Sequence, residues 1–277
     1  MLPPISASMI IDSDKIVALL RRVAAEQVMP AWRHLGKNDI GYKAGDEPVT
    51  VADHASELAL SAGLRELLPG SMVVGEEGVA NDPTRLALLA GDDWVWIVDP
   101  IDGTRNFAAG RPHFAVMIAL ARGGVTEGAW IYAPALESLG VAERGEGACL
   151  QGTACHIELT ARPASELRGT LHAGQFAPRD LAQKMSRRRD RVVALRSMGS
   201  AGIEYLRLLD GEMDFSFFSK LKPWDHAPGC LLLSEAGGIA RFSDCGNLYT
   251  PLQHKGEGLL LAPDEESWQR LHAVLLA

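Results

Sequence analysis

The sequence of 277 residues is poor in cysteine and aromatic residues, and it has no long uninterrupted hydrophobic run. Its cysteines form no C-x-x-C pair and no zinc-finger spacing, so we expect buried free thiols in a reducing compartment. No stretch reaches the roughly eighteen apolar residues of a membrane span, and the opening MLPPISASMIIDSDK lacks the basic and apolar regions of a secretion signal. We therefore expect a soluble, cytoplasmic protein with no membrane partner. The cysteines are Cys149, Cys155, Cys230 and Cys245.

An excess of positive charge is also missing. The net charge is −8, so the sequence predicts no general attraction to nucleic-acid phosphates, and a nucleic-acid partner is not expected. The same acidity predicts that an anionic substrate needs metal ions to offset local repulsion. The chain contains no GxxxxGK[ST] phosphate loop, which argues against nucleotide hydrolysis of that type.

Hydrophobic residues make up 47% of the chain and charged residues 22%, which is the balance of a globular protein with a sizeable core. Helical spacing of apolar residues runs over 12–34, where Pro30 should kink or end the helix, and a second helix is predicted over 50–68. Strands are predicted in SMVVGEEG, where an acidic turn follows, in WVWIV, which should stop at Asp99, and in HFAVMIAL, GAWIYAP and SLGVAER.

A Gly-rich turn at 144–152 ends this first section. Short strands in LRGTLHA, RVVALRS, DFSFF and GGIARF then alternate with helices over 201–209 and 228–236, and a last helix begins near Pro263. We therefore predict an N-terminal α+β half at 1–152 and a C-terminal α/β half at 153–277. The cleft between tightly packed halves is the default place for a site.

Acidic clusters follow strands or helix starts at four places: TVAD (50–53), GEEG (75–78), DPIDGT (99–104) and KPWDHAPG (222–229). Residues just past the carboxyl ends of strands line the functional crevice of an α/β protein. Asp99 and Asp102 can face one point across a proline-stiffened turn, and Glu76 follows its strand in the same way. Oxygen ligands without clustered His or Cys favour Mg²⁺, and two or more ions would relieve the repulsion among the carboxylates.

The DGT sequence adds a phosphate site to this prediction. If a helix begins at Thr104, the free N–H groups of its first turn favour an anion. Paired Mg²⁺ ions beside that helix start would activate a water, hold the phosphoryl oxygens and stabilise the leaving alkoxide.

Each acidic cluster also has a purely structural interpretation. TVAD fits a capping box with Thr50 and Asp53, and WDHAPG fits a helix start with Asp225 as the cap and Trp224 in the core. GEEG and DPIDG are ordinary turn sequences. These interpretations account for each cluster alone but not for all four in this order.

The order and spacing of GEE, WIVDPIDGTRNF, PHFAVMIAL and PWDHAPGCLLLSEAGG resemble the inositol monophosphatase family of Mg²⁺-dependent, lithium-sensitive phosphomonoesterases. The resemblance runs from about residue 43 to residue 238 and is specific for the superfamily rather than for one substrate. It implies the layered α-β-α-β-α sandwich of the inositol monophosphatase and fructose-1,6-bisphosphatase type. It also implies a homodimer.

The resemblance further implies a set of metal ligands. The first Mg²⁺ would be bound by Glu76, Asp99 and the backbone carbonyl of Ile101, and the second by Asp99, Asp102 and Asp225. A third, weaker ion would also contact Glu76, which makes two or three ions per site.

The catalytic roles that the resemblance implies centre on one water. That metal-bound water would be oriented by Glu76 and Thr104, while Asp53 would hold the Thr104 hydroxyl. Asp102 and the backbone N–H groups of Gly103 and Thr104 would contact the phosphate ester. The alcohol part of the substrate would meet a segment similar to the family's GTAA motif, made of Gly199, Ser200 and Ala201.

Three positions depart from the family pattern or have open roles. Arg105 stands where many members carry an uncharged residue; a structural role is favoured over contact with a substrate anion. Phe218 lies seven positions before Asp225, where animal-type enzymes place an acidic residue that binds sugar hydroxyls, and a phenyl ring cannot accept their hydrogen bonds. Lys43 resembles a family lysine on a loop near the metals, although a charged, Gly-containing loop is usually only a loop.

The leading hypothesis is Mg²⁺-dependent hydrolysis of a small phosphate monoester, nominally inositol 1-phosphate, by a metal-activated water. Histidinol phosphate, fructose 1,6-bisphosphate and 3′-phosphoadenosine 5′-phosphate are alternative substrates within the same class. A hypothesis of another class is a non-catalytic regulatory protein that acts through RNA or transcription partners. The intact set of acids favours catalysis, because unpaired buried acids are costly to keep without a use.

Overall fold

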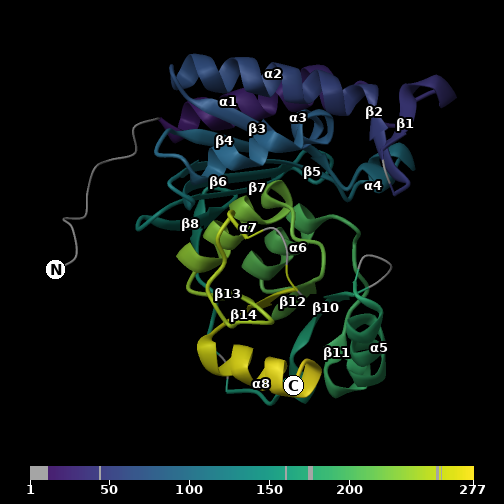
Figure 1. Ribbon diagram of the computed structural model, residues 1–277, viewed down its shortest axis with the longest axis vertical. Helices are drawn as coiled ribbons and strands as arrows, with labels where there is room; N and C mark the ends of the chain where they lie inside the picture. Colours follow the sequence, from purple (N-terminus) through teal and green to yellow (C-terminus); the bar gives the residue numbers. More distant parts are fainter. Residues whose placement is uncertain (1–11, 44, 160, 174–176, 254–255, 257) are drawn as a thin grey trace.

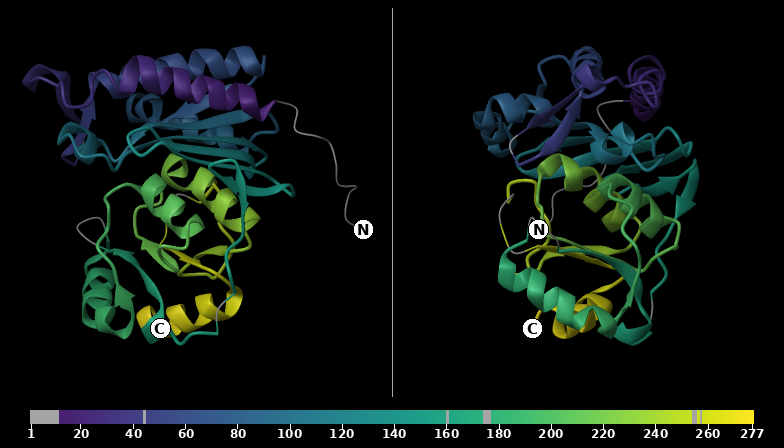
Figure 2. Two further views of the ribbon diagram at one scale, coloured as in Figure 1. Left: turned by 180° about the vertical axis from the view of Figure 1, so that it is seen from behind. Right: turned by 90° about the vertical axis from the view of Figure 1, so that its right-hand side faces the viewer.

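Two β-sheets alternate with three layers of helices in the computed structural model, which describes residues 12–277 except 44, 160, 174–176, 254–255 and 257 (Figure 1). Helices α1 and α2 cover the outer face of a seven-stranded sheet, α6 and α7 lie between this sheet and a five-stranded one, and α5 and α8 cover the far side. The two further views in Figure 2 show the same order of layers. The predicted α-β-α-β-α sandwich is confirmed.

The seven-stranded sheet follows chain order from β3 at one edge to β9 at the other. β3 runs parallel to β4, and the other neighbouring strands are antiparallel. Every residue of β4 is buried because helices cover both faces of the sheet, which explains the hydrophobic run VWIV at its start. The strands are β3 (Met72–Gly75), β4 (Val95–Asp102), β5 (Ala115–Arg122), β6 (Val125–Ala133), β7 (Ser138–Glu143), β8 (Gly147–Leu150) and β9 (Thr153–Cys155).

The outer helices bury the apolar face that their sequence predicts. α1 (Ser13–Val23) buries Ile16, Leu19, Leu20 and Val23 against the sheet, and a π-helical turn, Ala24–Val28, ends it before Pro30. The helix predicted over 12–34 is therefore shorter at its C-terminal end, because proline cannot continue the hydrogen-bond ladder. α2 (Val51–Leu67), the helix predicted over 50–68, runs beside it.

The five-stranded sheet has the order β11-β10-β12-β14-β13, with β10 parallel to β11 and β12. β14 and α5 are two elements that the sequence analysis did not predict. The strands are β10 (Arg168–His172), β11 (Val193–Ala194), β12 (Phe215–Phe218), β13 (Ile239–Phe242) and β14 (Leu259–Ala262). The helices are α5 (Arg179–Arg188), α6 (Ala201–Leu209), α7 (Pro223–Glu235) and α8 (Glu265–Leu275).

Four local predictions were wrong at their ends. β4 does not stop at Asp99 but continues to Asp102, and the predicted acidic turn after β3 is the first turn of α3 (Glu76–Asn81). The predicted Gly-rich turn at 144–152 contains β8, because pairing with β7 overrides the turn signal of its glycines. The helix predicted from residue 228 begins at Pro223, where proline fits the first helical turn.

The remaining elements are short. β1 (Ile40–Lys43) and β2 (Glu47–Thr50) form a separate hairpin, and α4 (Thr104–Ala108) follows β4. 3₁₀-helical segments lie at Lys37–Asp39, Pro83–Ala90, Ala164–Glu166 and Arg189–Arg191. The seven-stranded sheet extends past Gly152 through β9, and the division into halves at that residue stays a prediction. No helix in the described part of the chain combines the length and apolar character needed to cross a membrane.

Candidate active site

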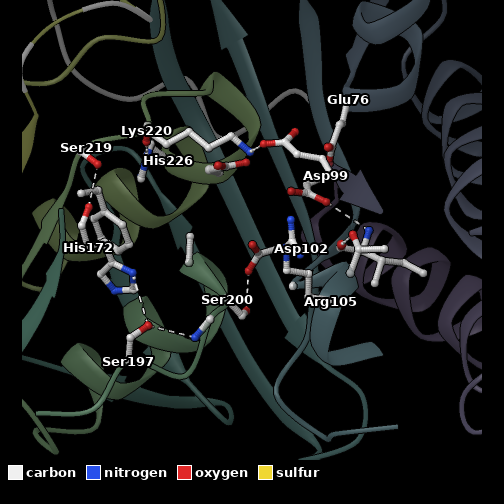
Figure 3. A pocket seen from close by; sticks show the side chains of 18 of the residues that line it. Glu76, Asp99, Asp102, Arg105, His172, Ser197, Ser200, Ser219, Lys220 and His226 are labelled. Atoms are coloured by element: carbon white, nitrogen blue, oxygen red, sulfur yellow. Dashed lines mark hydrogen bonds and ion pairs between the residues drawn. The ribbon is translucent and has the colours of Figure 1, made fainter. Parts of the chain in front are cut away.

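A cavity of about 490 Å³ opens between the end of β4, the β1–β2 hairpin and the helices α4, α6 and α7 (Figure 3). Its lining contains most of the residues that the sequence analysis selected: Glu76, Asp99, Ile101, Asp102, Gly103, Thr104, Arg105, Gly199, Ser200, Ala201, Phe218 and Asp225. Asp53 and Lys43 are not part of this lining, but each bonds a residue that is. The structure therefore brings the four acidic clusters to one place.

A bulge at the end of β4 turns two aspartates toward the cavity. Asp99 pairs with Met117 and Asp102 with Ala115, so β4 advances three residues while β5 advances two. Side chains alternate along a regular strand, and residues three apart would face opposite sides. The extra residue cancels this alternation, so that Asp99 and Asp102 both point into the cavity (Figure 3).

The turn after β4 requires glycine at position 103. Gly103 has a φ of 86°, and a Cβ there would lie 2.9 Å from both the His113 carbonyl oxygen and the Ser200 Cβ. This turn starts α4 at Thr104, as the DGT sequence predicts. The Thr104 Oγ1 lies 2.9 Å from the Ile101 carbonyl oxygen and 3.3 Å from Asp53 Oδ1.

Asp53 combines the structural role and the site role that the sequence left as alternatives. Its Oδ2 accepts hydrogen bonds from the Thr50 backbone N–H at 2.8 Å and from the Thr50 hydroxyl, which completes the capping box of α2. Its other oxygen faces Thr104. Burial raises the pKa of Asp53 to about 7, although the two Thr50 hydrogen bonds oppose that rise.

Asp102 is tied to the start of α6. Its Oδ2 accepts hydrogen bonds from the Gly202 backbone N–H at 2.7 Å and from the Ser200 hydroxyl. Ser200 is the N-cap residue of α6, so one hydroxyl links the end of β4 to the helix that carries the GTAA-like segment. Burial and the charge of Asp225 raise the pKa of Asp102 to about 7, against the effect of these hydrogen bonds.

Repulsion among the acids marks the centre of the cavity. Burial raises the pKa of Asp99 well above its usual value, and the nearby charges of Glu76, Asp102 and Asp225 raise it further. Burial also raises the pKa of Asp225, although Lys220 opposes the rise. Such a group stays ionised only when positive charge lies close by.

The ligand chemistry of these acids fits a hard divalent cation. Four carboxylates and the Ile101 carbonyl offer only oxygen, which Mg²⁺ prefers, and their mutual repulsion is what a cation would relieve. In the part of the chain that the structure describes, no three acidic, His or Cys groups converge closely enough to enclose an ion as they stand. The fit therefore rests on the type and burial of the ligands, and their side chains would have to rotate to bind an ion.

Three cations near the cavity already have oxygen partners. Lys43 Nζ lies 2.7 Å from both Glu76 Oε1 and Glu77 Oε1, and these charges raise its pKa despite burial, which lowers it. Lys220 Nζ lies 2.9 Å from Glu47 Oε1, and the Arg105 guanidinium donates to the Asp46 carbonyl at 2.5 Å. All three contacts join the β1–β2 hairpin region to the rest of the site. The hydrogen bond from Arg105 to the Asp46 carbonyl supports a structural role for this arginine.

Two supporting groups of the site were not predicted from the sequence. Glu57 on α2 accepts hydrogen bonds from the backbone N–H groups of Glu77 and Gly78 at 2.7 and 2.8 Å, and it thereby holds the start of α3. No local signal marks this residue, because its partners are distant in sequence. His172 lines the cavity at the end of β10, where the rule about carboxyl ends of parallel strands could have found it.

Comparisons with known proteins agree with this geometry. The inositol monophosphatase family matches residues 13–276. The inositol-1-monophosphatase of Rhizobium meliloti is 32% identical over 240 residues, which cover 82% of this chain and 86% of that protein. Nus factor SuhB of Pseudomonas aeruginosa is 32% identical over 226 residues, which cover 79% of this chain and 80% of that protein. A solved structure of an IMPase from Thermotoga maritima superimposes with a TM-score of 0.78 at 25% identity, over 95% of this chain and 97% of that one.

Proposed function

Since the chain belongs to the inositol monophosphatase family, which is of the phosphatase type, we propose that it hydrolyses a small phosphate monoester with water and Mg²⁺. The observation that carries this proposal is the set of four buried or half-buried acids around one cavity beside the Thr104–Asp53 contact. Repulsion among these carboxylates destabilises the folded protein. A bound cation would remove that repulsion, so cation binding explains why the acids are kept together.

Glu76, Asp99, Asp102, Asp225 and the Ile101 carbonyl are the groups that would hold Mg²⁺. When bound, the ions would lower the pKa of a water molecule, neutralise phosphoryl oxygens and stabilise the leaving alkoxide. Two or three ions per site, inhibition by Li⁺ and a homodimer are further parts of the proposal that rest on the family resemblance.

The Thr104 hydroxyl and the Glu76 carboxylate would orient the attacking water. The Thr104 hydroxyl hydrogen has two acceptors, the Ile101 carbonyl and Asp53 Oδ1, and with it directed to either one the Thr104 oxygen can accept a hydrogen bond from that water. Asp53 is fixed by the capping box, so its Oδ1 stays within reach of the hydroxyl. Glu76 would accept the second hydrogen of the water, which leaves an oxygen lone pair directed at phosphorus.

The phosphate and the alcohol would be bound by neighbouring segments. The backbone N–H groups of Gly103 and Thr104 begin α4, and such groups bind phosphoryl oxygens well. Because α4 has only five residues, we assign this effect to the N–H groups themselves rather than to a long helix dipole. Gly199, Ser200 and Ala201 border the same cavity and would contact the alcohol.

Inositol 1-phosphate is the first ester to test, because one relative is named an inositol-1-monophosphatase. One feature of the cavity argues for testing other esters as well, and a second argues against esters with two phosphate groups. Phe218 replaces the acid that would bind ring hydroxyls, and it is 5% exposed in the cavity wall. Lys220 and Arg105 are engaged with Glu47 and the Asp46 carbonyl, which weakens the case for a second phosphate group.

The test is Mg²⁺-dependent release of phosphate from inositol 1-phosphate, histidinol phosphate, fructose 1,6-bisphosphate and 3′-phosphoadenosine 5′-phosphate. We expect at least one ester to be hydrolysed, with activity lost on addition of EDTA and restored by Mg²⁺. No release from any of the four, in a sample shown by calorimetry to bind Mg²⁺, would contradict the proposal for these substrate types.

A regulatory protein that acts through RNA or transcription partners is the second candidate, because one relative is named Nus factor SuhB. The basic side chains of α5 give this candidate little support. Lys184 and Arg188 donate to the carbonyls of Leu276 and Ala277 at the end of the chain, so part of that positive charge serves the fold. Retention of the acid set favours catalysis over this candidate.

A further inference from the structure

Three aromatic side chains from different elements form a stack that ends in the cavity wall. The rings of Tyr205 and Phe218 lie 5.9 Å apart at 17°, and those of Phe218 and His172 lie 4.5 Å apart at 19°. Tyr205 and Phe218 are buried, whereas the His172 side chain is 21% exposed and lines the cavity. His172 is therefore the outermost ring of the stack, with one face against Phe218.

The inner end of the stack packs closely against α7. A Cβ at Gly229 would lie 2.1 Å from the Tyr205 ring, so the absence of a side chain there lets the ring pack on the helix backbone. The Tyr205 hydroxyl lies 3.1 Å from His226 Nδ1 and 3.2 Å from Cys230 Sγ. His226 Nε2 lies 2.7 Å from the Lys220 carbonyl, which only accepts, so Nε2 carries the hydrogen and Nδ1 accepts from Tyr205.

The outer ring is held at its edge, with its nitrogens turned toward the protein. His172 Nδ1 lies 3.3 Å from the Ser197 hydroxyl (Figure 3). Nε2 is buried and lies 3.5 Å from Glu204 Oε1, close enough for a charge contact but without a hydrogen bond. Glu204 is fully buried and is itself fixed by the Met198 backbone N–H at 2.8 Å and by Arg207 at 3.2 Å. The part of His172 left for the cavity is thus its ring surface, not a hydrogen-bonding nitrogen.

This wall is suited to a flat ring rather than to a polyol. Its neighbours in the cavity lining include the apolar side chains of Leu171 and Phe218, while the nearby Ser197 and Ser219 hydroxyls are engaged with His172 Nδ1 and the His172 carbonyl. A supported aromatic face favours a second ring stacked on it, with a gain of about three- to tenfold in binding over contact area alone. A cavity of about 490 Å³ has the size of a small-ligand site.

We propose that the alcohol part of the substrate carries a planar aromatic or heteroaromatic ring, which stacks on His172 while the phosphate lies at the acid cluster. His172 is then the residue that determines specificity, and Glu204 and Ser197 are positioning residues that hold its ring. This inference rests on the proposed function for the reaction itself, but the stacking can be measured without turnover.

A matched pair of esters tests the proposal directly. 2-Phenylethyl phosphate and 2-cyclohexylethyl phosphate share the linker, the primary alcohol and nearly the same size, and they differ in the flatness of the ring. With saturating Mg²⁺ we expect kcat/KM to be about three- to tenfold higher for the phenyl ester, with the difference in KM. Equal values, or a preference for the cyclohexyl ester, would overturn the proposal while leaving the phosphatase function in place.

A second pair separates binding from hydrolysis. 3-Phenylpropylphosphonate and 3-cyclohexylpropylphosphonate replace the ester oxygen by CH₂, so they cannot be cleaved at that bond, and calorimetry with Mg²⁺ measures their Kd. Tighter binding of the phenyl compound supports the stacking wall even if no ester is hydrolysed, in which case the proposed function fails alone. Equal binding overturns the stacking wall whether or not esters are hydrolysed.

Variants then assign the preference to His172. His172→Leu should bring the phenyl-to-cyclohexyl ratio close to one, and His172→Phe, which keeps an aromatic face, should retain it. His272→Leu is the matched control, because His272 stacks on Trp268 at 4.8 Å and 19° on α8, outside the cavity lining. A ratio unchanged in a folded His172→Leu protein would contradict the assignment. If that variant does not fold, the two pairs of compounds measured on the natural protein still test whether a flat ring is preferred.

Discussion

Asp102 shows how one residue can oppose stability and serve the site. It is buried, it repels Asp225, and it is nevertheless held by Ser200 and the Gly202 N–H, so its position is fixed at an electrostatic cost. Removing the charge of Asp102 should therefore have opposite effects on stability and on activity.

We predict that Asp102→Asn lowers Mg²⁺-dependent phosphate release by about a hundredfold or more, since a ligand carboxylate is lost. The fold should be unchanged or more stable without Mg²⁺, because repulsion with Asp225 is relieved while the amide oxygen still accepts from Gly202. Phosphate assays and thermal melts measure both effects, and Asp93→Asn, an exposed acid before β4, is the control. Near-normal turnover would rule out the assigned role.

Glu204 is a second single residue with a predictable effect, here on how the stability of the fold depends on pH. Burial alone would raise its pKa, but contacts with His172, Met198 and Arg207 outweigh burial and hold the pKa of Glu204 below its usual value. Such a group stabilises the fold fully above its unfolded pKa, about 4.3, and the stabilisation is lost as the pH falls through the lower folded value.

We expect Glu204→Gln to lower the free energy of unfolding by about 1–3 kcal/mol at pH 7, because a charged acceptor is replaced by a neutral amide. The difference from the natural protein should shrink as the pH falls below about 4, where the natural carboxyl also becomes neutral. Urea unfolding at both pH values provides the measurement. An equal difference at pH 7 and at low pH would show that charge is not the cause.

Among the helices, α7 is tightly enclosed by its neighbours. It lies between the two sheets and is buried on nearly all sides, and it carries both Asp225 and the glycine on which the aromatic stack packs. The position of Tyr205, and through it of Phe218 and His172, depends on the closeness of α6 to this helix.

Gly229→Ala should therefore destabilise the protein, by about 1–3 kcal/mol, although alanine favours helices. The reason is that the new Cβ would lie 2.1 Å from the Tyr205 ring, which must move. Chemical denaturation measures this change, and Gly91→Ala, where the nearest atom is a carbonyl oxygen at 3.4 Å, is the control. A variant as stable as the control would mean that α6 and α7 separate without cost.

For the whole molecule, the acids come from distant segments that only the fold assembles. Glu76 follows β3, and Asp99 and Asp102 lie in the last part of β4, whereas Asp225 lies on α7 from the later part of the chain. An ion bound among them would connect these segments and stabilise the folded state relative to the unfolded chain.

We predict that Mg²⁺ raises Tm in a concentration-dependent way, by an amount equivalent to about 2.7 kcal/mol at a hundred times Kd. EDTA should reverse the rise, and Asp225→Asn should reduce it, because one ligand from α7 is lost. Calorimetry over a Mg²⁺ series gives the measurement, with K⁺ at equal ionic strength as the control. A Tm that does not respond to millimolar Mg²⁺ would contradict the proposed metal site.

The sequence by itself determined the features that depend on neighbouring residues. The capping box of Thr50 and Asp53, the start of α4 after Gly103 and the buried first part of β4 all follow from local propensity and pattern. The family motifs also located the acids, because each motif is a short contiguous run. The same local rules failed at β8, where glycines signal a turn but pairing with β7 decides.

Only the tertiary structure decided how these pieces combine. The bulge that turns Asp99 and Asp102 to one side depends on pairing with β5, and the partners of Glu57, Arg105 and Lys220 come from other elements. The stack of Tyr205, Phe218 and His172 joins α6, β12 and β10, and no short segment contains two of its rings. Contacts of this kind arise when packing buries distant side chains together, so their geometry is a property of the folded chain and not of any single motif.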